Sequence, residues 1–304
     1  MGVAAWFARG RPGRRSRRGL VVVLCALAVL LALTACSGGP QTRADTAADV
    51  DAGHAARLDS VLAGDWRSAD NRARDAARRP AETLRFFGVR PGQTVIEITP
   101  GSGAWYAEIL APYLNESGQY IAAMVDPAAA AEGRARDYQQ AQRDGLQARF
   151  DAAPAQFGRA RMVAYDPAAP RFGPANSADV VLTFRNVHNW RNSGQAEAMF
   201  KGFYDVLRPG GVLGVVEHRA RGDVPDGDRS GYVGQAQVIA LAQAAGFRVD
   251  GSSEINANPK DNANHPKGVW TLPPTYAMGD TDRATYAAIG ESDRMTLKFV
   301  KPAN

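Results

Sequence analysis

The stretch Val95-Ile-Glu-Ile-Thr-Pro-Gly-Ser-Gly-Ala-Trp105 carries the strongest structural signal in the chain. It opens with an apolar run broken by one acid, which is typical of a buried strand, and two glycines follow. An amphipathic run then begins at Trp105. The pattern predicts a strand, a tight turn and the start of a helix; such a turn lets the backbone approach a ligand and directs helix N–H groups at it. A turn with a purely structural role would use the same residues.

Around this stretch, short apolar runs alternate with helical runs along most of the chain. We predict seven strands, at residues 95–98, 120–125, 161–165, 178–184, 212–216, 247–255 and 295–300. We predict helices at residues 80–87, 130–149, 197–207 and 235–245. The alternation predicts an α/β fold with a doubly wound, mostly parallel seven-stranded sheet that helices cover on both faces.

The remaining segments define the expected domain organisation. Residues 46–79 form an N-terminal helical segment, and residues 80–304 form the main domain. Within that domain, residues 256–294 are rich in Asn, Pro and Gly, which predicts a long irregular insert. Long loops of this kind are often functional, so the insert could cover the ligand cleft as a lid.

The first 35 residues have the order of an export signal. Arginines come first, an apolar run at residues 20–35 follows, and the leader contains no acid. Leu33-Thr-Ala-Cys36 resembles the lipobox of bacterial lipoproteins, in which the cysteine becomes lipidated. The resemblance implies a lipid anchor at Cys36, a tether at residues 36–45 and a location at the periplasmic face of the envelope, with Ser37 favouring the outer membrane. The alternative is a signal anchor that stays uncleaved.

Charge and cysteine content limit the possible partners. The chain has 36 basic and 31 acidic residues, and loss of the six arginines in the leader would leave 30 basic residues, a net charge of about −1. This balance favours a small-molecule substrate over nucleic acid. The two cysteines, Cys25 and Cys36, lie in or beside the leader, so the main domain has no disulfide or cysteine metal cluster. His188, His218 and His265 lack a paired i,i+4 ligand motif, so no metal is predicted.

From residue 80 to residue 302, the order of elements resembles that of the class I S-adenosylmethionine-dependent methyltransferases. Glu97 with Gly101 and Gly103 matches the acid-plus-glycine loop of that family, in which the glycines let the backbone pass beside the cofactor. Two further segments match the family, residues 88–98 and 207–213. Three others are similar to a narrower group of bacterial predicted methyltransferases: residues 183–190, 216–219 and 290–301. The resemblance implies a Rossmann-like methyltransferase fold with S-adenosylmethionine as cofactor.

The same resemblance assigns cofactor contacts to residues at the strand ends. It implies that Glu97 meets the amino group of the methionine moiety and that Asp126 accepts hydrogen bonds from both ribose hydroxyls. A carboxylate has two acceptor oxygens, which suits a diol. Asp166 would reach the adenine amine, although an Asp-Pro pair is also an ordinary turn. Thr99 belongs to the cofactor loop and stands where the family usually has glycine.

Polar side chains gather after the fourth and fifth predicted strands, opposite the cofactor loop. The fifth strand ends in Glu217 and His218, and the fourth is followed by Arg185, Asn186, His188, Asn189 and Trp190. Because ligands of open α/β sheets bind outside the carboxyl ends of the strands, these groups should line one cleft. Histidine titrates near neutral pH, so His188 is the first candidate for a base or substrate-orienting residue. His218, paired with a carboxylate, is the second, and Asn186 completes the predicted catalytic set. The alternative is that the histidines only satisfy buried hydrogen bonds.

Arginines are concentrated at the end of the N-terminal helical segment: Arg72, Arg74, Arg78 and Arg79. They fall within or just after one or two predicted helices. A solvated helix face explains them more simply than an anion site.

The sequence therefore predicts a membrane-anchored, S-adenosylmethionine-dependent methyltransferase that acts on an unidentified small-molecule acceptor. The alternative function is a non-catalytic lipoprotein that uses the methyltransferase fold to bind another nucleoside or small metabolite. The presence of Glu97 and Asp126 at the cofactor-contact positions favours the enzyme, whereas Thr99, in place of the usual glycine, favours the binding protein.

Overall fold

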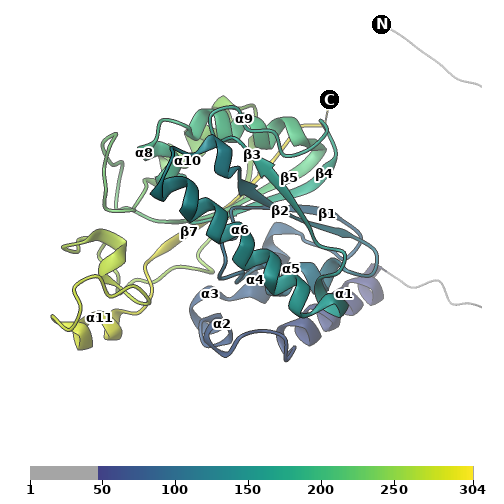
Figure 1. The fold of residues 1–304 in the computed structure, drawn as a ribbon, viewed down its shortest axis with the longest axis horizontal. Coiled ribbons are helices and arrows are strands. Elements are labelled where there is room, and N and C mark those ends of the chain that lie inside the picture. Colours follow the sequence, from purple (N-terminus) through teal and green to yellow (C-terminus); the bar gives the residue numbers. More distant parts are fainter. Residues whose placement is uncertain (1–46, 304) are drawn as a thin grey trace, which may run out of the picture. The chain divides into compact units, whose positions relative to one another are not determined.

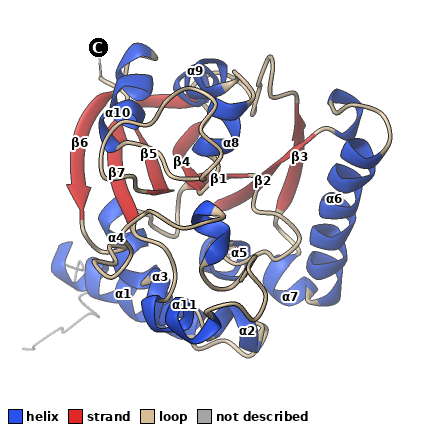
Figure 2. Cartoon of the chain, turned by 90° about the vertical axis from the view of Figure 1, so that its left-hand side faces the viewer, coloured by secondary structure: helices blue, strands red, loops and turns tan. Residues whose placement is uncertain are grey.

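A seven-stranded sheet lies between two layers of helices in the computed structural model, which describes residues 47–303 (Figure 1, Figure 2). The strands lie in the order β3-β2-β1-β4-β5-β7-β6; β7 is antiparallel to both neighbours and the other pairs are parallel. Their bounds are β1 (Thr94–Ile98), β2 (Gln119–Val125), β3 (Arg161–Tyr165), β4 (Ala178–Phe184), β5 (Leu207–His218), β6 (Arg248–Ser253) and β7 (Arg294–Val300). The predicted doubly wound, mostly parallel seven-stranded sheet is confirmed.

The helices differ from the prediction near the N-terminus, in the insert, and at residues 154–157 and 187–192, where short helices were not predicted. Three short or medium helices occupy the N-terminal segment, where one or two were expected, and the insert contains helical turns as well as irregular chain. The helices are α1 (Ala47–Leu62), α2 (Ala69–Arg72), α3 (Asp75–Arg78), α4 (Pro80–Phe87), α5 (Ala107–Leu114), α6 (Arg134–Ala152), α7 (Pro154–Phe157), α8 (Val187–Asn192), α9 (Ala196–Val206), α10 (Gln235–Ala244) and α11 (Arg283–Ile289), with 3-10 turns η1 (Pro127–Ala129) and η2 (Gly268–Thr271).

A bulge makes β5 longer than predicted. Leu207 pairs with Ala178 and Val212 pairs with Val180, so the residues between Leu207 and Val212 interrupt the ladder without ending the strand. Gly210, in this bulge, has a φ of +77°, a left-handed conformation that glycine adopts at no steric cost. The strand start predicted at residue 212 is therefore wrong.

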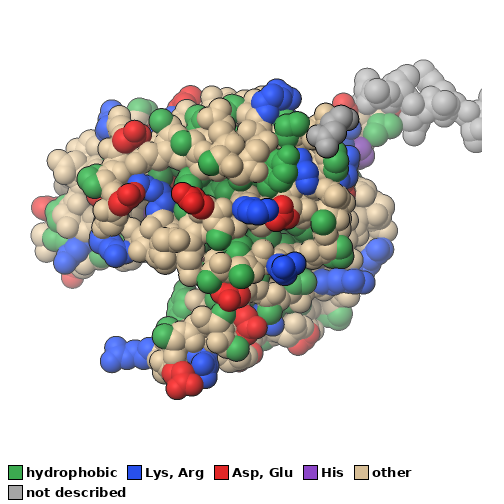
Figure 3. Space-filling model, turned by 90° about the horizontal axis from the view of Figure 1, so that it is seen from above, with side chains coloured by type: hydrophobic (Ala, Val, Ile, Leu, Met, Phe, Trp, Pro, Cys, Tyr) green, Lys and Arg blue, Asp and Glu red, His purple; other side chains and the backbone are tan. Residues whose placement is uncertain are grey.

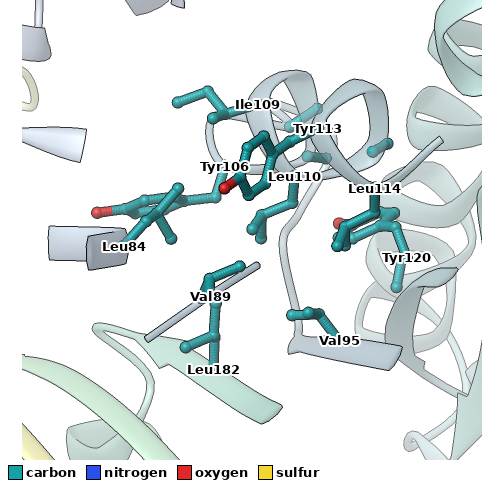
Figure 4. Packing of buried hydrophobic residues seen from close by; sticks show 14 of the residues in the cluster. Leu84, Val89, Val95, Tyr106, Ile109, Leu110, Tyr113, Leu114, Tyr120 and Leu182 are labelled. Carbon is teal, nitrogen blue, oxygen red and sulfur yellow. The ribbon is translucent and has the colours of Figure 1, made fainter. Parts of the chain in front are cut away.

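Two hydrophobic clusters cover the two faces of the sheet, and β1 contributes to both. Val95 belongs to the cluster under α5, where Figure 4 shows it with Leu110 and Tyr113 of that helix. Ile96 and Ile98 belong to the second cluster, on the face that carries α9 and α10. A fully buried large apolar side chain stabilises a fold by roughly 1.5–3 kcal/mol, so β1 is firmly held from both sides. This position explains the apolar run that gave the sequence signal.

The buried carboxylate of Asp261 ties the insert to the sheet. It accepts hydrogen bonds from the Tyr232 hydroxyl and the backbone N–H of Asp293, each at 2.8 Å, and lies 2.8 Å from Nε2 of His265. Arg219, which directly follows β5, forms an ion pair with Asp293 at 2.9 Å. These contacts fix the insert beside the carboxyl end of β5.

None of the helices between residues 47 and 303 is long and apolar enough to cross a bilayer. The predicted export signal, the tether and the lipidation site at Cys36 lie outside the described residues. They stay predictions.

Candidate functional site

The carboxyl ends of β1, β2 and β4 lie side by side at one end of the sheet. Glu97 pairs with Ala122 in the parallel ladder, so both side chains point to the same face. Alternation carries that face along β2 to Asp126, where the backbone is still extended. Glu97 and Asp126 therefore lie on one face of the sheet, on the two strands next to the glycine loop at residues 99–103.

Glu97 is a buried acid, and only one of its two carboxylate oxygens accepts a hydrogen bond. Its side chain is on the packed face of β1 and only 3% of the residue is exposed. The Tyr120 hydroxyl donates a hydrogen bond of 2.7 Å to Oε2, whereas Oε1 has no hydrogen-bond partner among the described residues. Burial raises the pKa of Glu97 to about 7, against the opposing effects of the Tyr120 hydrogen bond and the positive charge of Arg185. A cationic group placed beside Oε1 would favour the ionised form.

Thr99 turns its side chain away from this acid. Its hydroxyl lies 2.7 Å from the hydroxyl of Tyr165, which packs in the cluster on the opposite face of the sheet. Thr99 also has a φ of +51°, a left-handed conformation that is unfavourable for a β-branched residue. The structure thus keeps Thr99 in the loop but leaves only its backbone on the side where Glu97 lies.

Side chains from two other elements hold the rest of the loop. The amide oxygen of Gln142, on α6, accepts hydrogen bonds from the backbone N–H and the hydroxyl of Ser102, at 2.9 and 3.1 Å. Asn71, on α2, donates from Nδ2 to the carbonyl of Gly103 at 3.0 Å. Gly101 has a φ of +69°, whereas a Cβ on Gly103 would meet no atom within 4 Å. Gly101 thus serves the turn, and open space lies beside Gly103.

Asp126 and Asp166 lie next to each other after β2 and β3. The backbone N–H of Asp126 donates to the carbonyl of Tyr165, which joins the two strand ends. Each acid accepts one local hydrogen bond on Oδ1, Asp126 from the N–H of Ala128 at 2.9 Å and Asp166 from the N–H of Ala168 at 2.8 Å. The second oxygen of each has no hydrogen-bond partner among the described residues. Both can accept further hydrogen bonds from a ligand.

Glu217, at the end of β5, holds His188 in a defined orientation. Its Oε1 lies 3.1 Å from Nδ1 of His188, and its Oε2 accepts from the backbone N–H of Val187 at 2.6 Å, at the start of α8. The carboxylate also accepts the N–H of His218 at 2.8 Å. With Nδ1 facing a carboxylate, the neutral ring of His188 carries its proton on Nδ1 and exposes a basic Nε2.

His218 and Asn186 have different surroundings from His188. Nδ1 of His218 lies 2.5 Å from the Ser292 hydroxyl, and the two histidine rings are 5.6 Å apart between centroids. Burial, followed by the charges of His188 and nearby arginines, lowers the pKa of His218 well below its usual value, so this ring is neutral. Asn186 donates to the Ile98 carbonyl at 2.9 Å and therefore braces β4 against β1. The structure brings the two histidines together and gives Asn186 a supporting contact.

The same histidines and Glu217 form a group with metal-ligand spacing within the described part of the chain. One ligand atom from each of His188, Glu217 and His218 lies within 4.8 Å of the others. However, both oxygens of Glu217 accept N–H donors, and Nδ1 of each histidine has a hydrogen-bonding neighbour. These contacts orient His188 and leave Nε2 as the ring nitrogen of each histidine that has no hydrogen-bond partner among the described residues.

A pocket of about 320 Å³ opens beside these histidines. Its walls come from α3 and the residue before it, from the end of β4 and the helix α8 that follows, from the end of β5 and from the start of β7. The insert contributes Trp270, Pro273 and Thr275. Arginines dominate the polar lining: Arg74, Arg78, Arg185 and Arg294, which we call the arginine cluster. Glu291 is the one acid that lines this pocket. By contrast, basic and acidic side chains are interspersed on the face in Figure 3.

The arginine cluster corrects the solvated-face interpretation of the N-terminal arginines. Arg78 is only 3% exposed, and both Arg74 and Arg78 form ion pairs with Glu291, at 2.6 and 3.3 Å. Arg72 and Arg79 are exposed, as expected. The prediction failed for Arg74 and Arg78 because α2 and α3 are separate short helices, so the four arginines do not share one face.

Arg185 lines the pocket, as expected from its place after the fourth strand. Sequence reasoning did not select several other residues that now define the site: Tyr120, Gln142, Glu291 and Arg294. One signal pointed toward two of them, because Glu291 and Arg294 lie within the tail segment that resembles bacterial predicted methyltransferases. Tyr120 and Gln142 carried no local signal, because their roles depend on the register of β1 and β2 and on the packing of α6.

Neither a protein-family model nor a curated protein sequence matches the chain. Among solved structures, the [4+2]-cyclase SpnF has a TM-score of 0.52 and 18% identity, over 86% of this chain and 98% of that one. A SAM-dependent methyltransferase from Aquifex aeolicus has a TM-score of 0.46 and 16% identity, over 66% and 93% of the two chains. SAM-dependent methyltransferases from Methanosarcina mazei have a TM-score of 0.46 and 12% identity, over 73% and 97%.

Strand order is the feature that defines the fold. The sequence β3-β2-β1-β4-β5-β7-β6, with β7 antiparallel between β5 and β6, is the arrangement of class I methyltransferases. The similarity to SpnF extends over nearly the whole described chain but, at 18% identity, bears on the fold alone. Residues 47–303 therefore have the class I S-adenosylmethionine-dependent methyltransferase fold.

Proposed function

We propose that this chain is an S-adenosylmethionine-dependent methyltransferase that acts on a small acceptor and is held at a membrane by a lipid on Cys36. One observation carries the enzymatic part. Glu97 and Asp126 share one face at the ends of neighbouring strands, beside a glycine loop, and the oriented His188–Glu217 pair follows the next strands in the sheet. Ligands of open α/β sheets bind at this end of the strands.

The residues present fit the cofactor. Glu97 is a buried carboxylate whose Oε1 lacks a partner, as expected for an acid that meets a cationic amino group. Asp126 and Asp166 each keep one oxygen for ribose hydroxyls and the adenine amine. The open space beside Gly103 allows the loop backbone to lie against a ligand.

His188 would act on the acceptor. When bound, S-adenosylmethionine supplies an electrophilic methyl group on a sulfonium. Nε2 of His188 can accept a proton from the acceptor's nucleophilic atom, while Glu217 holds Nδ1 and stabilises the imidazolium. His218 stays neutral and can accept or donate a hydrogen bond to orient the acceptor. Positioning of the two reactants accounts for the rest of the rate enhancement.

A non-catalytic binding protein is the second candidate, and one observation favours it. Thr99 has a strained backbone and its hydroxyl forms a hydrogen bond with that of Tyr165. The methyltransferases that the sequence resembles usually have glycine at this position, so the loop differs from theirs. The [4+2]-cyclase SpnF also has this fold, which indicates that the fold alone does not require methyl transfer. Such a protein would use Asp126 and the loop to bind another nucleoside or small metabolite.

Calorimetry of the full chain, purified in detergent, tests the cofactor assignment. We expect saturable binding of S-adenosylmethionine, and we expect Gly103→Ala to weaken it by roughly 10–100-fold, because a Cβ would intrude on a ligand packed against the loop. The thermal stability of Gly103→Ala should equal that of the wild type, since the Cβ meets no atom within 4 Å. Gly92→Ala is the matched control, because its Cβ also meets open space but lies at the opposite end of β1.

The outcomes separate the two candidates. Absence of heat at millimolar S-adenosylmethionine would end the enzymatic proposal. Mass spectrometry of any ligand that co-purifies then decides: an adenosyl compound supports the methyltransferase, and a different nucleoside or metabolite supports the binding protein.

The lipid anchor is tested separately. Cells that express the full chain and are fed a labelled fatty acid should transfer the label to the wild type and to Cys25→Ser, but not to Cys36→Ser. The lipobox-like segment at residues 33–36 supports this expectation. An unlabelled wild-type protein that stays with the membrane would instead indicate an uncleaved signal anchor.

A further inference from the structure

The arginine cluster has more positive charge than its surroundings neutralise. Arg74, Arg78 and Arg294 all hydrogen-bond to the carboxylate of Glu291. Together these three arginines hold the pKa of Glu291 at about 2, although burial opposes its ionisation. One carboxylate therefore forms hydrogen bonds with three guanidinium groups, and Arg185 feels the charge of Glu291 without forming a hydrogen bond to it.

Arg185 is the unpaired member of the cluster. Its guanidinium has no hydrogen-bond or ion-pair partner among residues 47–303, although the side chain lines the pocket. Burial, with the charges of Arg294 and other neighbours, lowers the pKa of Arg185 to about 10. Arg294 is also incompletely satisfied, because it is 2% exposed and its buried Nε has no partner. Arg185 itself is half-buried, so its unpaired guanidinium is open to a charged group in the pocket, whereas the unpaired Nε of Arg294 is a buried polar atom that is costly to leave without a partner.

Other side chains of the protein compensate only part of the positive charge of the arginine cluster. Cζ of Arg78 lies 4.8 Å from the centroid of the Trp105 ring, a cation–π contact that helps one arginine. Glu97 is close enough to Arg185 for the arginine to affect its ionisation, but it forms no ion pair with it. What the pocket lacks is an anion that pairs with Arg185 and adds to the single negative charge of Glu291.

We propose that this pocket binds an oxyanion, a phosphate or carboxylate group, and that this group is part of the methyl acceptor. The volume of about 320 Å³ suits a small molecule. Guanidinium groups bind both kinds of oxyanion with paired, charge-assisted hydrogen bonds. His188 and His218 line the same pocket, so an acceptor held at the arginines by its anionic end extends toward the proposed base. The role of this group as part of the acceptor rests on the proposed function, whereas the anion site itself does not.

The charge of the acceptor also matters for the neighbouring cofactor site. The positive charge of Arg185 acts on Glu97, so the two sites are electrostatically coupled. A sulfonium is itself cationic, and an arginine cluster with Glu291 as its one counter-ion keeps a net positive charge that disfavours its binding. An oxyanion in the pocket removes this repulsion, so acceptor and cofactor should each bind more tightly in the presence of the other.

Binding of simple oxyanions to the full chain tests the proposal. Inorganic phosphate and citrate are titrated by calorimetry against sodium chloride at equal ionic strength. We expect saturable binding of at least one oxyanion and a roughly 10–100-fold loss of affinity in Arg185→Met, the range for charge-assisted hydrogen bonds. Arg185→Met breaks no internal hydrogen bond or ion pair and should fold. Arg191→Met removes the same charge from α8 outside the pocket, where Arg191 pairs with Asp226, and should bind as the wild type does.

A second measurement uses the wild-type protein alone. Burial, His188, Arg294, Arg185 and Arg78 together depress the pKa of His218, so an anion bound to the cluster should raise it. NMR of isotope-labelled histidine should show this rise with phosphate or citrate and not with chloride. Preference between the two probes tells a phosphorylated acceptor from a carboxylic one.

The remaining outcomes would overturn the proposal or show which part of it is wrong. Equal affinity in the wild type and Arg185→Met, or an equal effect of chloride, would mean that the cluster attracts only general counter-ions. Oxyanion binding without S-adenosylmethionine binding would retain the anion site and reject methyl transfer. S-adenosylmethionine binding without oxyanion binding would retain the enzyme and reject the anionic acceptor.

Discussion

Glu217→Ala is expected to lower the free energy of unfolding by roughly 3–5 kcal/mol, the cost of removing one partner from a buried charged network. The carboxylate is fully buried and accepts hydrogen bonds from the backbone N–H groups of Val187, His188 and His218, besides the contact with Nδ1 of His188. Alanine would leave these donors without partners and would remove the negative charge at the start of α8. Urea unfolding followed by circular dichroism measures the loss.

Two further variants show whether hydrogen bonding or charge is responsible. Glu217→Gln keeps one acceptor oxygen, so it should lose roughly 1–3 kcal/mol, less than the alanine variant. Glu254→Ala is the surface control: Glu254 forms an ion pair of 2.7 Å with Arg219 but its side chain is 69% exposed, so removal should cost about 1 kcal/mol or less. If Glu217→Ala and Glu254→Ala were equally stable, the assigned role of Glu217 in holding α8 and His188 would be wrong.

The fold could be predicted because its main signals are local. β1 is buried on both faces, so its sequence is apolar throughout apart from Thr94 and Glu97. Strands that alternate with helices then require parallel neighbours and bring the acids at the carboxyl ends of β1, β2 and β3 to the same end of the sheet. The positions of Glu97, Asp126 and Asp166 follow from this arrangement.

The insert was harder to predict because its structure depends on polar contacts. α11 has no buried residue, so it lacks the apolar stripe by which a helix is recognised in a sequence. The insert is held by Asp261, which Tyr232 and the backbone of Asp293 contact from distant parts of the chain. Residue composition reveals that such a segment is not a regular element, but not which carboxylate anchors it.

The arginine cluster could not be derived from the sequence for a related reason. Arg78 and Glu291 are 213 residues apart, and neither has a neighbour in the chain that indicates the other. Burial of an arginine is a tertiary property, whereas the sequence shows only a run of basic residues, which is usually solvated. The strand-end histidines were accessible to sequence reasoning because they directly follow predicted strands; the charges that surround them were not.

Glu97→Gln is expected to make the protein more stable at pH 8 while leaving its stability at pH 4.5 unchanged. Burial raises the pKa of Glu97 from 4.5 to about 7, so the folded protein binds this proton more tightly than the unfolded chain does. The stability gained from the proton is complete below pH 4.5 and is lost as the pH rises through 7. Glutamine cannot ionise and keeps an acceptor oxygen for the Tyr120 hydroxyl, so it does not suffer this loss.

The difference between the two proteins should grow from near zero at pH 4.5 to at most about 3 kcal/mol at pH 8. In a chain of this size, that corresponds to a rise in melting temperature of roughly 6–12 °C. Thermal unfolding at a series of pH values measures it. Glu197→Gln, an exposed acid at the start of α9, is the control and should follow the wild-type curve. Parallel curves for the wild type and Glu97→Gln would mean that Glu97 titrates in the ordinary range.

The same substitution should weaken the binding of S-adenosylmethionine at pH 8 by roughly 10–100-fold, the effect of losing a hydrogen bond between charged groups. Stability and binding thus change in opposite directions at one residue. A buried carboxylate that accepts a hydrogen bond on one oxygen only lowers the stability of the ligand-free fold at neutral pH, and Tyr120 offsets only part of that cost. Such a group is expected where a cationic ligand completes its surroundings, so a stabilised variant that still bound the cofactor normally would contradict the role assigned to Glu97.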